Sequence, residues 1–483
     1  MKKHISLLLL ASLLASLAAC GAQADTENET SGTPGETTPA VEKLSDGLPD
    51  KNMDGFELKI LHCSQDWMNW VNVQLDAEAE NGDLVNDAIY RRNVATEERF
   101  KCSISVEDSE KNTAGSYQNL VMSGDNPYDI IMVYGISTMG LVDNYADIGK
   151  IPYLSLDEHW WNPDATSVFR LGEKQLCAAG AFSLSYASTA NCFLFNKRIY
   201  NEMNTGKSLY DLVDSGKWTT DKYFEIAAKA ARDLNGDSKM DGSDLWGTNG
   251  TAKSFLHLLV IGGGQHYVTK DSDGFPLFNA AKDEKLVSLL EKIVNFENKD
   301  PYGYTSPQSL LGTVEEVQFA DGGCLFQVSW GHEITFYRDM KDDFGIIPAP
   351  KYDEKQEKYY ANMANGEVMT LPRSYDADRL ENLGILLEAM SFYTYHNILP
   401  VYKTELLQTK VARDEDSSRM LDLIFDGVTY DFGVNVWQEN LGNKIVSDIL
   451  IDKSDAIVST LSSLSTAVDG DIEKLRESVE AVP

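Results

Sequence analysis

The chain has 483 residues and a formal charge of −33 at pH 7, with 75 acidic against 42 basic side chains. Because so acidic a surface repels phosphate backbones, a nucleic-acid partner is not expected. The aromatic share of 10% supplies rings for a hydrophobic core, and the length indicates two or three folding units.

The first 19 residues have the pattern of a secretory signal peptide. Lys2 and Lys3 precede an apolar run, residues 5–17, that is too short to span a bilayer comfortably. The run ends in "LAAC", which resembles a bacterial lipobox, in which Cys20 would be acylated and become the first residue of the mature chain. A plain secretory peptide cut after a small residue is the alternative.

Residues 20–55 are predicted to form a flexible tether behind the acylated cysteine. Residues 21–55 hold no Phe, Tyr or Trp and are rich in Thr, Glu, Gly and Pro, so they cannot bury a core. The folded body is therefore expected to start near Phe56. No other run is apolar enough and long enough to span a membrane.

Strands and helices alternate at the start of the body. Apolar strands separated by amphipathic helices favour βαβ units, in a parallel sheet that is covered on both faces. The predicted elements are a strand at 58–63, a helix at 82–100, a strand at 102–106, a helix at 116–122 and a strand at 128–134.

Longer helices dominate from residue 201 to about residue 320, and strand-like sequence then returns. The later strand-like stretches are "GGCLFQVSW" (322–330), "FGIIPAPKYDEKQ" (344–356) and "GEVMTLPRS" (366–374), after which helices continue to the end. No internal repeat is visible.

Four stretches carry a resemblance to a known family. They are "DNPYDIIMVYG" (125–135), "SYASTANCFLFNKRIYNE" (185–202), "FADGGCLFQVSWG" (319–331) and "FGIIPAPKYDE" (344–354). In this order, and after a lipobox and tether, they resemble the family 1 extracellular solute-binding proteins of ABC importers, of the maltose/oligosaccharide-binding type, over residues 56–483. Phe195 stands where the family has Tyr, and Cys324 where it has Lys.

The resemblance implies an α/β, two-lobe periplasmic-binding-protein-like fold of type II, in which three segments cross between lobes that close by hinge motion. The crossings are expected near 185–191, 326–330 and 366–371. The implied boundaries are 56–185 and 326–370 for lobe 1, and 186–325 and 371–483 for lobe 2.

The resemblance also implies the function. A lipid-anchored, monomeric protein on the extracellular face of the cell membrane would capture a carbohydrate, expected to be an oligosaccharide, in the cleft between the lobes and deliver it to ABC permease subunits. Two alternatives stay open: a secreted lipoprotein glycoside hydrolase, and a lipoprotein that binds peptides or cell-wall fragments on the same scaffold.

Motifs for catalysis are missing from the sequence. "GHEITF" (331–336) begins like a zinc-protease motif, but Phe336 stands where the second histidine is needed. No phosphate-binding loop or nucleophile elbow occurs either. Adjacent acidic pairs such as Asp157–Glu158 are interpreted as solvated faces, so the chain is not expected to be an enzyme.

Sugars expose flat C–H faces and hydroxyl rims, so a sugar site needs aromatic platforms and a few fixed polar groups. Rings at strand ends and crossings are the candidates, although core packing is the alternative for each tryptophan. The aromatic candidates are Trp67, Trp70, Tyr134, Tyr186, Trp330 and Trp437. The polar candidates are Asp66, Asn69, Asn362 and Asn365.

A calcium loop is predicted in "RDLNGDSKMDGSDLWG" (232–247). Its spacing matches the ligand positions of an EF-hand loop, although Ser238 stands at the glycine position and the last ligand is Asp rather than Glu. The expected ligands are the side chains of Asp233, Asn235, Asp237, Asp241 and Asp244 and the carbonyl of Lys239. Calcium would be structural here, and an acidic turn without metal is the alternative.

Five cysteines remain besides Cys20, and none has a CxxC or metal-site spacing. Their apolar neighbours favour buried thiols. A disulfide between Cys63 and Cys102, on neighbouring predicted strands, is left open.

Overall fold

The structure is a computed structural model, and its compact body begins at Asp46. The signal peptide, Cys20 and most of the tether lie outside the described residues, and so does Trp70. The described residues are 45–69, 71–109, 113–124, 126–134, 142–298, 304–306, 319–363, 365–373, 375–407, 415–452 and 454–482.

The body starts ahead of the predicted position at Phe56. Asp46 pairs with Arg99, Lys51 pairs with Glu381 at 2.7 Å, and the Met53 side chain is buried. The last ten residues of the predicted tether are thus fixed to the body by ion pairs and one apolar anchor.

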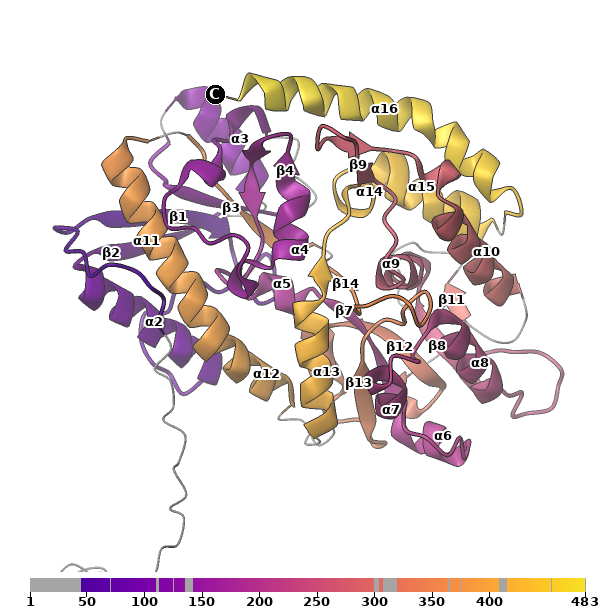
Figure 1. The fold of residues 1–483 in the computed structure, drawn as a ribbon. Helices are drawn as coiled ribbons and strands as arrows, with labels where there is room; N and C mark the ends of the chain where they lie inside the picture. Colours follow the sequence, from indigo (N-terminus) through magenta and orange to yellow (C-terminus); the bar gives the residue numbers. More distant parts are fainter. Residues whose placement is uncertain are drawn as a thin grey trace, which may run out of the picture. The chain divides into compact units, whose positions relative to one another are not determined.

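The first sheet has the strand order β2-β1-β3-β15-β6, in which β1 is parallel to β2 and β3 and β15 is antiparallel to β3. This confirms the predicted βαβ order. Figure 1 labels β1, β2 and β3 of this sheet. The strands are β1 (Glu57–Cys63), β2 (Ser103–Ser109), β3 (Ile130–Tyr134), β6 (Cys177–Ala178) and β15 (Glu367–Thr370), and the helices beside them are α2 (Leu84–Phe100), α3 (Thr113–Ser123) and α11 (Ala377–Tyr393).

Side chains of the first sheet alternate between two apolar clusters, as period-2 strands require. Ile60 and Met132 pack with Leu386 of α11, whereas Leu61 and Val133 belong to the other cluster. Both faces are therefore buried, as the apolar strand sequences predict.

The second sheet has the order β11-β8-β12-β7-β13. Every residue of β7 is buried, because helices cover this sheet too: Phe193 of β7 stacks on Tyr223 of α8 with ring centroids 4.8 Å apart. The elements are β7 (Asn191–Asn196), β8 (Trp246–Thr251), β11 (Tyr304–Ser306), β12 (Cys324–Trp330), β13 (Phe344–Ile347), α8 (Thr220–Ala230), α9 (Ala252–Gly262) and α10 (Glu284–Asn298).

Short helices and two-residue strands connect and cover the sheets. The helices are α4 (Pro163–Thr166), α5 (Ser185–Ser188), α6 (Lys197–Glu202), α7 (Leu209–Asp214), α12 (Leu399–Leu407), α13 (Glu415–Asp426), α14 (Phe432–Asn435), α15 (Asn443–Ile445) and α16 (Ile457–Ala481), with a 3-10 turn η7 (Gly331–Tyr337) and a π turn η8 (Thr394–Ile398). The strand pairs are β4–β5 (Arg170–Leu171, Lys174–Gln175), β9–β10 (Thr269–Lys270, Pro276–Leu277) and β14–β16 (Ala361–Asn362, Val428–Thr429).

The chain crosses between the sheets at α5, between β14 and β15, and around α12, which contacts α2 as well as α13. The first two crossings meet at a bridge between Ala190 and Met363. The predicted crossings near 185–191 and 366–371 lie at or beside these segments.

The predicted crossing at 326–330 is wrong. These residues form β12, which pairs with β7 on one side and β8 on the other inside the second sheet. The predicted boundaries change accordingly: 326–363 belongs to the second lobe, and α11 packs on the first sheet rather than with the lobe 2 helices. Strand spacing alone could not assign β12 to a sheet.

Cys63 and Cys102 are not joined by a disulfide. Cys63 ends β1 opposite Ser109, whereas Cys102 lies just before the other end of β2. Six residues of extended strand separate the two levels by about 20 Å, far beyond disulfide reach.

In the described part of the chain, no helix has both the length and the apolar character needed to span a membrane.

Candidate ligand-binding site

A cavity of about 720 Å³ opens at the carboxyl ends of β1, β2 and β12, and we call it the cleft. In open α/β sheets this edge is where ligands bind. Residues of both lobes and of the α5 crossing line it. They are His62, Gln65, Asn69, Val71, Asn72, Gln74, Leu75, Asp76, Asn81, Asp83, Val85, Asn86, Val106, Asp108, Ser188, His332, Thr335, Phe336, Tyr402, Glu405 and Leu406.

The loop after β1 forms one wall of the cleft and is braced by the side chain of Gln65, an exposed residue. The Gln65 amide donates to the carbonyls of Met68 (3.0 Å) and Val71 (2.7 Å), and its side-chain oxygen accepts the Val73 N–H (3.2 Å). With Gln65 committed to the loop, the exposed Asn69 is one of the amides that line the cleft.

Ser188, on the α5 crossing, connects the two walls. Its Oγ accepts the backbone N–H of Asn72 at 2.9 Å, and its carbonyl oxygen lies 2.9 Å from Nδ1 of His332. Ser188 is fully buried. The lobe 1 loop and the lobe 2 turn η7 are thus both bonded to one hinge residue.

The η7 wall presents aromatic rings. The half-buried rings of Trp330 and His332 are nearly parallel, with centroids 6.1 Å apart, and Phe336 meets His332 edge-on. Phe336 is 68% exposed, which is unusual for a phenylalanine, and it lines the cleft. An exposed ring beside polar groups is the arrangement that a sugar face needs.

Negative charge dominates the cleft. Asp76, Asp83, Asp108 and Glu405 line it, and among its described lining residues there is no lysine or arginine. Burial, and the nearby charge of Asp83, raise the pKa of the half-buried Glu405 carboxyl. The cleft therefore offers hydrogen-bond acceptors in a field that disfavours anions.

An acid–base cluster of the buried His62 and Glu367 and the exposed Asp108 lies at the end of β1. Nε2 of His62 lies 2.6 Å from the Asp108 carboxylate, and Cys63 N–H donates to Glu367 at 2.9 Å. Burial by itself would lower the pKa of His62, but the bond to Asp108 and the charge of Glu367 outweigh it and raise the pKa. Burial raises the pKa of Glu367 to about 7.

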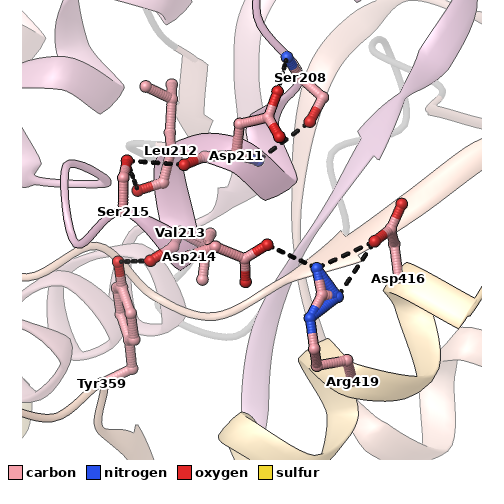
Figure 2. A network of polar contacts seen from close by, with 9 residues as sticks. All are labelled: Ser208, Asp211, Leu212, Val213, Asp214, Ser215, Tyr359, Asp416 and Arg419. Atoms are coloured by element: carbon pink, nitrogen blue, oxygen red, sulfur yellow. Dashed lines mark hydrogen bonds and ion pairs between the residues drawn. The ribbon is translucent and has the colours of Figure 1, made fainter.

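A second cavity of about 550 Å³ lies among α4, α7, α13 and the segment after β13. Its charged groups are largely paired with one another. Arg419 bonds Asp214 at 2.6 Å and Asp416 at 2.9 Å, and Lys358 bonds Asp164 at 2.8 Å (Figure 2 shows the Arg419 pairs). Because these charged side chains already pair with one another, the second cavity offers few polar groups to a ligand.

The predicted residues around the first strand come together. Trp67 meets Tyr134 edge-on with ring centroids 5.7 Å apart, and Asp66 is exposed on the same loop. Asn69 lines the cleft itself. Trp330 lies half-buried against His332, behind the residues that line the cleft.

The other predicted residues lie away from the cleft lining. Tyr186 is 3% exposed and lines the second cavity, and Trp437 is 9% exposed and packs on Phe432. Asn362 is buried, with its N–H bonded to Asn191, and Asn365 takes a positive φ of 65° in a turn. These side chains are buried in the core or held in a turn, and their aromatic or amide character alone could not predict that.

Sequence reasoning missed His332, Phe336, Asn72 and Glu405 as cleft residues. The sequence analysis considered His332 and Phe336 only as part of a zinc-protease motif, which Phe336 rules out. The signal that could have identified them is their place directly after an apolar strand, since turns at strand ends form clefts.

The predicted calcium loop is held by its own backbone. The Asp233 carboxylate accepts the N–H groups of Gly236 and Ser238, and the buried Asp244 accepts those of Leu234 and Asp241. In the described ranges no three His, Cys, Asp or Glu side chains converge on a common metal position. Calcium binding there stays a prediction.

No family model matches the sequence, and no curated protein does. Solved structures match with a probability of 1.00. The cyclic alpha-maltosyl-1,6-maltose binding protein of Arthrobacter globiformis has a TM-score of 0.55 at 12% identity, covering 87% of this chain and 100% of that one.

Two further structures agree. An ABC substrate-binding protein from Listeria monocytogenes in complex with cycloalternan has a TM-score of 0.53 at 13% identity and covers 87% and 100% of the two chains. A family 1 extracellular solute-binding protein from Bifidobacterium longum subsp. infantis has 0.54 at 12%, covering 86% and 99%. The chain therefore has the two-lobe α/β fold of extracellular solute-binding proteins.

Proposed function

We propose that this protein is a lipid-anchored extracellular solute-binding protein that captures a carbohydrate in the cleft and delivers it to an ABC permease. The observation that carries the proposal is the composition of the cleft. The exposed ring of Phe336, the exposed amide of Asn69 and the carboxylate of Glu405 line one cavity between the two lobes. These are groups that stack on sugar C–H faces and accept from hydroxyls.

The fold supports this proposal. Two of the similar structures are described by a cyclic maltose-based sugar and by cycloalternan, both oligosaccharides. A cleft of about 720 Å³ is within the range of small-ligand pockets and has room for an oligosaccharide segment.

The first test is a thermal-shift screen of the body, residues 46–483, against neutral and acidic oligosaccharides and short peptides. A ligand that binds only the folded state raises Tm by mass action. Product analysis of the same mixtures then separates binding from hydrolysis. Stabilisation by peptides alone, or release of shorter sugars, would contradict the proposal.

Variants locate the site. Phe336→Ala and Trp330→Ala are expected to weaken sugar binding about tenfold or more with little change in Tm, since a ring contact contributes about 1 kcal/mol beyond its buried area. Trp437→Ala is the matched control: its ring is 9% exposed in the core, so Tm should fall. Unchanged affinity in both Phe336→Ala and Trp330→Ala would place the site elsewhere.

A further inference from the structure

We propose that the cleft recognises its ligand through hydrogen-bond acceptors, with His332 as a specificity-determining residue, and selects a hydroxyl-donating sugar that carries no negative charge. This inference rests on the proposed carbohydrate function and adds the chemical class of the sugar.

The tautomer of His332 follows from its partner. Nδ1 lies 2.9 Å from the carbonyl oxygen of Ser188, and a carbonyl oxygen can only accept, so Nδ1 carries the proton. Half-burial lowers the pKa of His332, which keeps the ring neutral at pH 7. In a neutral ring protonated at Nδ1, Nε2 is a bare acceptor.

Nε2 is free to meet a ligand. His332 lines the cleft, and no group in the described part of the chain bonds its Nε2. The ring is held between Trp330 and Phe336, and turning it over would break the bond to Ser188. Ser188 thus fixes both the orientation of the His332 ring and the nitrogen that carries its proton.

The charged side chains that line the cleft with His332 are acidic, apart from His62, while amides such as Asn69 and Asn72 can donate as well as accept. Glu405 has no ion-pair partner among the described residues, and Arg338 acts on it only through longer-range charge. Around the cleft lie Asp76 on the loop after β1, Asp83 before α2, and the His62–Asp108 pair, while Glu333 on η7 turns its carboxyl toward Ser329.

A ligand that bonds His332 and Glu405 therefore has to bring donors to these two side chains. Hydroxyls can donate to Nε2 of His332 and to Glu405, whereas a carboxylate or phosphate would meet a lone pair and uncompensated negative charge. Repulsion of that kind costs more in a half-buried cavity than in water. Acidic sugars should be rejected.

The tautomer is tested in the ligand-free protein by ¹⁵N NMR of the imidazole rings, assigned with His332→Asn. The expected spectrum at neutral pH shows His332 protonated at Nδ1 with a non-protonated Nε2. A ring protonated at Nε2, or on both nitrogens, overturns the inference without reference to any sugar.

Selectivity is tested with maltotriose, cellotriose and mannotriose as neutral probes and trigalacturonate as the acidic probe. The neutral sugars should include the tightest binder, with trigalacturonate at least tenfold weaker, and Glu405→Gln should narrow that gap. Equal or tighter binding of trigalacturonate overturns the inference. Binding of none of the four counts against the proposed function, and the NMR spectrum then decides separately on the fixed acceptor.

A third arm separates recognition from structure. His332→Asn keeps a donor near Ser188 but removes the cleft-facing acceptor, so affinity should fall about tenfold with Tm unchanged. The affinity of the wild type for the sugar should also fall when the pH drops below the pKa of His332, because protonation turns Nε2 into a donor. This pH-dependent loss of affinity should be absent in His332→Asn. His159→Asn, in the second cavity, is the control with unchanged affinity. A normal affinity and pH profile in His332→Asn overturns the assignment.

Discussion

Glu388 of α11 shows how a carboxylate is kept inside the core. It is 2% exposed and accepts from the indole N–H groups of Trp160 (3.0 Å) and Trp161 (2.6 Å) and from the backbone of Ser155 (3.1 Å). Three donors around one carboxylate compensate its lost hydration. The side chain joins α11 to the segment that covers the first sheet.

Glu388→Ala should therefore lower the free energy of unfolding by about 3 kcal/mol, because it leaves the buried Trp161 indole N–H and two part-buried donors without an acceptor. Urea denaturation followed by tryptophan fluorescence measures it. Glu381→Ala is the control on the same helix: it removes a partly exposed ion pair with Lys51, and a loss below about 1 kcal/mol is expected. If the two variants lose the same free energy of unfolding, the indole hydrogen bonds to Glu388 stabilise the fold no more than a partly exposed ion pair does.

Glu367 on β15 predicts a pH dependence of stability. Burial raises its pKa to about 7 in the folded protein, above the ordinary value of 4.5. The protonated acid is thus favoured by folding, so its contribution is fully present below about pH 4.5 and is lost as the pH rises through 7. The raised pKa of His62 acts in the same direction.

Glu367→Gln should remove most of this pH dependence while keeping an oxygen for the Cys63 N–H. From pH 5 to pH 8, the free energy of unfolding of the wild type should fall by roughly 2 kcal/mol relative to the variant. Urea midpoints at the two pH values measure this difference. Parallel pH curves for the two proteins would contradict it.

At the scale of elements, two helical glycines have opposite roles. A Cβ on Gly384 of α11 would lie 1.7 Å from the carbonyl oxygen of Pro152, whereas a Cβ on Gly470 of α16 would meet nothing within 4 Å. Gly384 therefore lets α11 approach the 148–152 segment closely, and Gly470 is only a weak point in a helix.

Replacing glycine by alanine should change the free energy of unfolding in opposite directions at these two positions. Gly384→Ala should destabilise by about 2 kcal/mol or more, because backbone has to move apart. Gly470→Ala should stabilise by about 0.5 to 1 kcal/mol through helix propensity. Differential scanning calorimetry of both variants measures the two effects, and a stable Gly384→Ala would show that α11 can shift without cost.

The loop between α8 and β8 carries the calcium prediction. Added calcium should raise Tm and EDTA should reverse the rise, with no effect in Asp237→Ala, because hard cations prefer clustered oxygens. Since Asp233 and Asp244 already accept backbone N–H groups, binding would require their carboxylates to turn. A wild-type Tm that ignores calcium and EDTA would establish an acidic turn held by backbone bonds alone.

At the scale of the whole molecule, the predicted acylation of Cys20 would decide where the protein is found. Cys20→Ala should move the protein from the membrane fraction to the medium or periplasm, since no helix of the described body can span a bilayer. Cell fractionation with an immunoblot measures the distribution. Full retention of the variant in the membrane fraction would rule out a lipid anchor at this residue.

The sequence by itself determined the element types and the fold class. Apolar strands such as 58–63 and 128–134 are buried on both faces, so their composition predicts a covered parallel sheet. The cap of α8 was readable as well, because the Thr219 hydroxyl accepts the Lys222 N–H within one turn. These features depend on neighbours in sequence.

The tertiary structure alone decided sheet membership and the cleft. β12 pairs with β7, more than a hundred residues earlier, and that pairing is set by long-range packing. Trp437 and Phe336 are both aromatic, yet one is buried and the other is exposed at the cleft. Hydrophobicity favours burial of each ring equally, and only the position of the surrounding elements determines which one is left for a ligand.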